Sequence, residues 1–140
     1  MTLGRGSALY ITDRIGLPNQ NHFSRELYEK LKVRTTLDLA AGQNPQEMTC
    51  HKMGIRQLLI DSFYPESFEV NIQRVQIDFM DYEKLDKASK NFCNNSKVDV
   101  VISIGSIEHL VKNGGHILIL NMFKLAHLLV IIETPNGFVH

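Results

Sequence analysis

Two acidic residues follow short apolar runs, at positions where a parallel sheet would bring them to one edge. Asp38 lies in the stretch 37–45 (LDLAAGQNP), where small residues form the turn and a proline suits the first position of the next helix. Small residues let the backbone pass close to a ligand, and Gly42 and Asn44 are residue types that tolerate a left-handed conformation. On this loop alone, a tight turn that binds nothing is an equally good interpretation.

The second acid, Asp61, ends the run 58–61 (LLID), 23 residues after Asp38. This spacing resembles that of the acid which accepts hydrogen bonds from both ribose hydroxyls in dinucleotide-type sites. A strand-end cap is the alternative interpretation of Asp61 alone. Together the two acids favour an adenosine-containing ligand.

Short apolar runs alternate with helical stretches along the chain. We expect strands at 35–40, 56–60, 75–79, 98–104 and 128–133, and helices at 24–31, 45–53, 82–92 and 115–126. The runs 98–102 and 128–132 are nearly continuous, as in strands that are covered on both faces. The alternation predicts a doubly wound, mainly parallel α/β sheet, in which ligands bind beyond the carboxyl ends of the strands.

Length and composition indicate one globular domain. The 140 residues are 44% hydrophobic and 21% charged, and 15 basic residues balance 15 acidic ones. We expect an irregular lead-in over 1–21 and one α/β domain over 22–140. The zero net charge disfavours nucleic acid as the main partner. No leader pattern and no apolar stretch of about 18 residues is present. We therefore expect a cytoplasmic protein without membrane contact, with Cys50 and Cys93 reduced.

Several stretches resemble, in order, the motifs of class I S-adenosylmethionine-dependent methyltransferases. The stretch 37–42 looks like the family's first motif, and Asp61 matches its ribose-binding acid. The stretch 79–85 resembles the acid-containing loop that meets the adenine, and 98–110, which ends in EHL, is similar to the fourth-strand motif. The stretch 131–138 resembles the fifth strand and loop of members that act on small molecules.

The resemblance implies that the chain binds S-adenosylmethionine and transfers its methyl group to a small-molecule acceptor. The cofactor-binding residues that it implies are Asp38, Ala40, Gly42, Asp61, Ser62, Asp81, Tyr82, Ser103 and Gly105.

Individual roles follow from the same resemblance. Asp38 would lie beneath the first turn and orient its amides, and Asp61 would take the ribose hydroxyls. Asp81 would accept from the adenine amino group with Tyr82 beside it, unless it is only the N-cap of the next helix. Ser103 and Gly105 would close the pocket next to the transferable methyl group.

Glu108 and His109 are the candidate acid/base pair. A histidine near the loop after the fourth strand can deprotonate a hydroxyl acceptor. A structural cap at the start of a helix is the alternative for this pair.

The chain also departs from the family. Members often have Gly at the positions of Ala40 and Asn44, so a larger side chain there should narrow the approach of the methionine moiety. Members also continue with two further strands, whereas this sequence ends at His140. The resemblance therefore implies a truncated form or a natural short isoform with weak or absent activity, and an open edge at 128–132 that favours self-association.

Two other functions compete with this one. A non-catalytic methyltransferase-like module that acts through a partner or oligomer is the main alternative. A nicotinamide-dependent oxidoreductase is disfavoured because the first loop lacks the G-x-G-x-x-G turn that a pyrophosphate needs.

Overall fold

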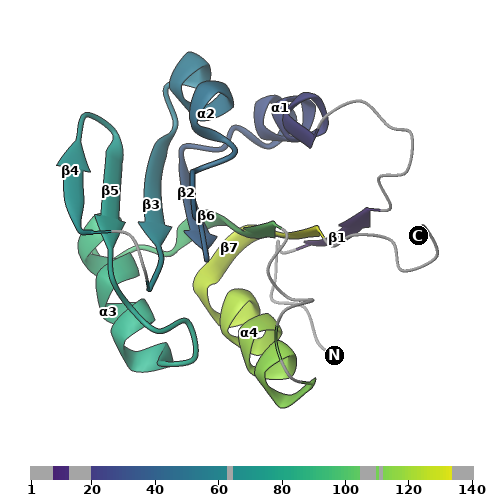
Figure 1. Cartoon of the computed structure of the whole chain (residues 1–140). Coiled ribbons are helices and arrows are strands. Elements are labelled where there is room, and N and C mark those ends of the chain that lie inside the picture. Colours follow the sequence, from purple (N-terminus) through teal and green to yellow (C-terminus); the bar gives the residue numbers. More distant parts are fainter. Residues whose placement is uncertain (1–7, 13–19, 63–64, 105–109, 111, 134–140) are drawn as a thin grey trace.

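A computed structural model describes residues 8–12, 20–62, 65–104, 110 and 112–133 (Figure 1). The strands are β1 (Ala8–Thr12), β2 (Thr35–Leu39), β3 (Arg56–Ile60), β4 (Ser67–Glu69), β5 (Ile72–Val75), β6 (Val98–Ile104) and β7 (Ala126–Glu133). The helices are α1 (Gln20–Leu31), α2 (Glu47–Met53), α3 (Tyr82–Phe92) and α4 (Lys112–Leu125).

The strands form one sheet in the order β1-β7-β6-β2-β3-β5-β4. All neighbours are parallel except β4 and β5, which form an antiparallel pair. Strand order runs outward in both directions from β2, so the topological switch point lies between β2 and β6. The predicted doubly wound, mainly parallel α/β sheet is confirmed.

Helices cover both faces of this sheet (Figure 1). On one face, α3 and α4 pack on a cluster that includes Leu37, Ile60 and Val101. On the other face, α1 and α2 pack on a cluster that includes Val100 and Ile102. Burial on both faces explains why β6 and β7 are nearly continuous apolar runs in the sequence.

The third predicted strand was placed wrongly. The structure has β5 at Ile72–Val75 instead of a strand at 75–79, because Val75 pairs with Ile60 at the end of β3. Ile77 and Phe79 belong to the connection to α3, and they pack on the core from there.

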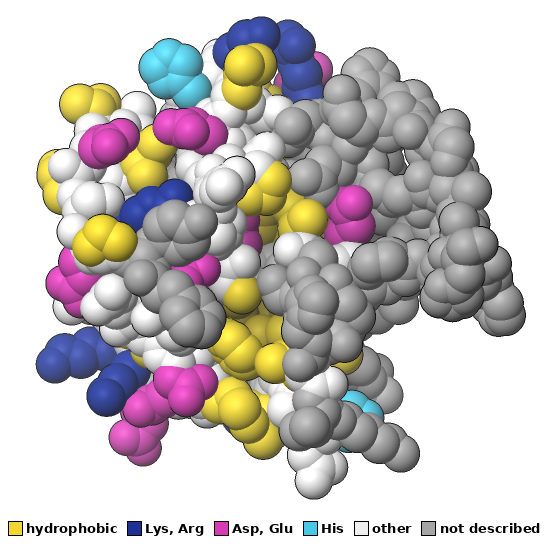
Figure 2. Space-filling model, in the orientation of Figure 1, with side chains coloured by type: hydrophobic (Ala, Val, Ile, Leu, Met, Phe, Trp, Pro, Cys, Tyr) yellow, Lys and Arg dark blue, Asp and Glu magenta, His cyan; other side chains and the backbone are white. Residues whose placement is uncertain are grey.

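Strand β4, which was not predicted, forms the edge of the sheet beside β5. All three of its residues are exposed, and Phe68 is 81% exposed. Val70, in the turn that follows, is 86% exposed. Figure 2 shows hydrophobic side chains at the surface over this edge.

The expectation of an irregular segment over 1–21 is wrong at β1. This strand pairs in parallel with β7, from Ala8 opposite Leu129 to Thr12 opposite Glu133. The run 128–132 is therefore an inner strand, hydrogen-bonded to β1 on one side and to β6 on the other. Self-association through an open edge of this strand loses its structural basis.

Val130→Lys should therefore unfold the protein instead of reducing association. Val130 is fully buried between β1 and β6, so the substitution places an ammonium group in the core at an expected cost of about 4 kcal/mol or more. Urea denaturation followed by circular dichroism measures the loss. Leu120→Lys is the control, because Leu120 is 51% exposed on α4 and should tolerate the same change. A folded Val130→Lys protein would contradict the inner position of β7.

Within the residues that the structure describes, no helix is both long enough and apolar enough to cross a membrane.

Candidate functional site

The loop after β2 has an alternating left-handed backbone. Ala40, Gly42 and Asn44 have φ angles of 62°, 53° and 59°. This conformation was expected of Gly42 and Asn44, whereas at Ala40 it costs about 1 kcal/mol. The Ala41 amide donates to the Ile60 carbonyl oxygen at 3.1 Å and so fastens the loop to the end of β3.

The side chain of Asn44 lies inside the protein. Asn44 is 5% exposed, and its amide exchanges two hydrogen bonds with the amide of Gln57 on β3, at 3.0 and 2.9 Å. The expectation that the side chain of Asn44 narrows the approach of the methionine moiety is therefore wrong. The amide of Asn44 instead satisfies the hydrogen-bonding groups of the buried Gln57 amide.

Gly42 is held from two directions. Its amide donates to Asp61 Oδ2 at 2.8 Å, and its carbonyl oxygen accepts from Arg74 Nη1 at 2.9 Å. Asp61 follows β3 and Arg74 lies on β5, so three neighbouring strands meet at this turn. A Cβ built on Gly42 would meet no atom within 4 Å, so the described residues leave the space beside this glycine open.

Asp38 is buried behind this turn. Its exposure is 1%, and neither carboxylate oxygen has a hydrogen-bond partner among the described residues. Asp38 pairs with Leu59, which pairs with Arg74, so strand alternation puts these three side chains in one row on the same face.

Burial raises the pKa of Asp38 well above its ordinary value. The positive charge of Arg74 opposes this rise, and the negative charge of Asp61 adds to it. The expected role of Asp38 in orienting the amides of the turn is wrong for the described residues, because the Gly42 amide bonds to Asp61 instead.

The other predicted residues of the fourth-strand motif are only partly described. Ser103 is fully buried in β6, and its hydroxyl has no hydrogen-bond partner within the described ranges. Asp38 pairs with Ile102, so Ser103, one residue further along, points to the opposite face of the sheet. Gly105, Glu108 and His109 lie outside the described residues, and their roles stay predictions.

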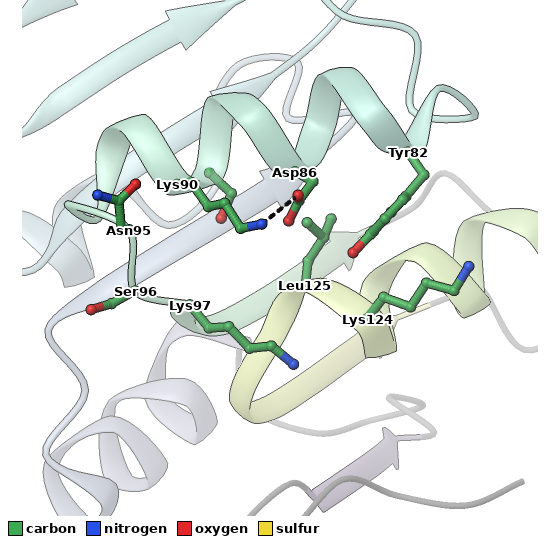
Figure 3. A pocket seen from close by; sticks show the side chains of 9 residues that line it. Tyr82, Asp86, Lys90, Asn95, Ser96, Lys97, Lys124 and Leu125 are labelled. Carbon is green, nitrogen blue, oxygen red and sulfur yellow. Dashed lines mark ion pairs between the residues drawn. The ribbon is translucent and has the colours of Figure 1, made fainter.

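Asp81 acts as the helix cap that was its alternative interpretation. Its carboxylate accepts from the Lys84 amide at 3.3 Å at the start of α3, and Lys84 Nζ lies 3.8 Å from the same group. Tyr82 packs toward α4, where Lys124 Nζ lies 4.8 Å from the centre of its ring (Figure 3). Ser62 is exposed directly after Asp61.

Arg74 is the residue that the sequence analysis missed. It stood one residue before the strand predicted at 75–79 and was therefore treated as part of a connection. The run 72–75 (IQRV) gave no signal for it, because Ile72 and Arg74 share one face of the strand and the run therefore shows no alternation of apolar and polar residues.

No protein-family model and no curated protein matches the sequence. Among solved structures, the chain is similar to a SAM-dependent methyltransferase from Archaeoglobus fulgidus, with a TM-score of 0.55 and 19% sequence identity. The match covers 85% of this chain but 55% of that one, so this chain spans little more than half the length of its neighbour. Together with the strand order, this similarity shows that the chain has the Rossmann-like fold seen in a SAM-dependent methyltransferase.

Proposed function

We propose that this chain binds S-adenosylmethionine and transfers its methyl group to a small-molecule acceptor. The observation that carries the proposal is the turn at Gly42, which Asp61 and Arg74 hold in a left-handed conformation beside the switch point of the sheet. In open α/β sheets this is the place where nucleoside ligands bind.

The residues present are compatible with an adenosyl ligand. In this proposal the ribose hydroxyls donate to the same carboxylate of Asp61 that accepts the Gly42 amide at 2.8 Å. Asp61 is half-buried, which strengthens hydrogen bonds from ribose hydroxyls relative to bulk water. The ligand has no phosphate, so it does not need a G-x-G-x-x-G turn.

The chemistry then belongs mainly to the cofactor, which supplies a methyl group activated by its sulfonium. In this proposal, Asp61 binds the ribose, and Gly42 allows the ligand to approach the backbone closely. The remaining task of the protein is to align the acceptor with the carbon–sulfur bond. Glu108 and His109 stay the predicted acid/base pair for a hydroxyl acceptor.

Asp61→Ala tests the proposal. Loss of a carboxylate that accepts ribose hydroxyls removes about 1.5–3 kcal/mol of charge-assisted hydrogen bonding, so S-adenosylhomocysteine should bind at least about ten-fold more weakly. Isothermal titration calorimetry measures both affinities, and thermal melting shows that the variant is folded.

Asp99→Ala is the matched control. Asp99 accepts backbone amides from Arg34 and Thr35 at 2.8 and 3.3 Å, so its loss also weakens the fold, but it lies at the opposite ends of the strands. A folded Asp99→Ala protein should bind the ligand with unchanged affinity. Equal affinity in Asp61→Ala and the parent would make Asp61 a structural cap. A parent that does not bind S-adenosylhomocysteine would favour the non-catalytic module.

A further inference from the structure

A cavity of about 310 Å³ lies between α3 and α4, at the amino ends of β6 and β7 (Figure 3). The segment 95–97 leads into β6, and Lys124 and Leu125 end α4 directly before β7. Val98 pairs with Ala126, so Lys97 and Leu125 are held at the same level of the sheet. The turn at Gly42 and Asp61, proposed to bind the cofactor, follows the carboxyl ends of the strands, so this cavity is separate from it. Tyr82, which the resemblance places beside the adenine, lines this cavity instead.

The cavity carries an excess of positive charge. Lys90, Lys97 and Lys124 line it, and Asp86 is the one acidic side chain among its described lining residues. Asp86 Oδ2 lies 2.9 Å from Lys90 Nζ, and this hydrogen bond raises the pKa of Lys90. Asp86 therefore neutralises Lys90, which leaves the charges of Lys97 and Lys124.

At Asn95 and Ser96, side chains must provide the contacts to a ligand, because the backbone amides of these two residues are already used. The Asn95 amide donates to the Lys90 carbonyl oxygen at 2.8 Å, and the Ser96 amide donates to the Cys93 carbonyl oxygen at 3.1 Å. Figure 3 shows the side chain of Lys97 extending toward α4 and the hydroxyl end of Tyr82 pointing toward Leu125.

A local site fits these charges better than an extended surface for a polyanion. Elsewhere on α3, Lys84 pairs with the capping Asp81 at 3.8 Å. Lys87 lines a different, shallower hollow with Ile77 and Ala88. Among the described residues that line the larger cavity, the lysines without a carboxylate partner are Lys97 and Lys124.

We propose that this cavity binds a small organic phosphate. Lys97 and Lys124 carry two positive charges, which equal in number the negative charges of a phosphate monoester. Figure 3 shows their ammonium groups pointing in different directions, so these flexible side chains must turn toward the phosphate to pair with it. The volume exceeds that of the phosphate group and lies at the lower limit of ligand pockets, so it also accommodates an organic part against Tyr82 and Leu125. This second site does not depend on the proposed methyltransferase function.

Phenyl phosphate titrated into the full chain at low salt tests the proposal. Chemical shifts of the backbone amides should saturate, with the largest changes at residues 95–97 and 124–125. Lys97→Gln and Lys124→Gln should each weaken binding about five-fold, as expected for one partly solvated ion pair. Lys87→Gln is the matched control, because it removes the same charge from α3 outside the cavity and should leave the affinity unchanged.

Each contrary outcome overturns a stated part of the proposal. Absence of saturation at about 10 mM phenyl phosphate, which corresponds to negligible affinity, would remove the site. An equal loss of affinity for phenyl phosphate in Lys87→Gln would show diffuse attraction by a basic surface. The same conclusion would follow if a single-stranded oligonucleotide bound more tightly than phenyl phosphate and Lys87→Gln weakened its binding equally. Equal affinity for inorganic phosphate would overturn the organic part of the ligand. Thermal melting checks that each variant is folded.

Discussion

Asp38→Asn should increase the free energy of unfolding at pH 8 by about 2 kcal/mol or more. The substitution removes an ionisable group from a fully buried position. The carboxylate at this position has no hydrogen-bond partner among the described residues. Burial raises the pKa of Asp38 in the folded protein, so the folded state holds its proton at pH values where the unfolded chain has lost it. The contribution of Asp38 to stability therefore falls as the pH rises above its ordinary pKa.

Urea denaturation at pH 4 and pH 8 measures this effect. The gain from Asp38→Asn should be small at pH 4 and large at pH 8, so the variant should show a flatter dependence of stability on pH. Asp99→Asn is the control: Asp99 accepts two backbone amides, so the same substitution should destabilise the protein. A loss of stability in Asp38→Asn at pH 8 would show that the carboxylate has partners that stabilise its charge.

Arg74→Ala should decrease the free energy of unfolding by about 3 kcal/mol at pH 8. The change removes the hydrogen bond to the Gly42 carbonyl oxygen and the positive charge that lowers the pKa of Asp38. The pKa of Asp38 should then rise further, because only burial and the charge of Asp61 remain to act on it. The loss should therefore be smaller at pH 4, where Asp38 is protonated in the folded state and about half protonated in the unfolded state.

A double-mutant cycle isolates the charge effect. In the Asp38→Asn background, Arg74→Ala should cost at least about 1 kcal/mol less, because its charge no longer offsets a buried carboxylate. Arg25→Ala removes an arginine from an exposed ion pair with Glu29 and should change stability by less than about 0.5 kcal/mol. Equal losses from Arg74→Ala in both backgrounds would show that the charge of Arg74 does not act on Asp38.

The sequence was sufficient to predict the elements with strong local signals. The helix expected at 82–92 has the same bounds in the structure, because Asp81 caps it and its apolar positions recur at helical spacing. Strands at 56–60 and 98–104 also agree, since their buried runs are nearly continuous. The meeting of Asp61 with the turn at Gly42 follows from that pattern, because parallel strands end at one edge.

Elements that depend on distant partners could not be predicted in this way. Strand β1 is short, and its identity as a strand depends on pairing with β7. Strand β4 is exposed throughout, so no alternation of burial distinguishes it. The roles of Asp38 and Arg74 depend on strand register, since a shift by one residue would turn either side chain to the other face.

The pairing of β1 with β7 also has a consequence for the order of folding. Its partners Ala8 and Leu129 are 121 positions apart, whereas β2 and β3 pair over much shorter separations. Contacts between distant positions form late, because the chain must close a long loop before they contribute. We therefore expect a partly folded species in which β6 and β7 have formed and β1 has not yet added to the sheet. In that species the apolar run of β7 is the edge of the sheet, so aggregation through this strand is a hazard of folding and refolding.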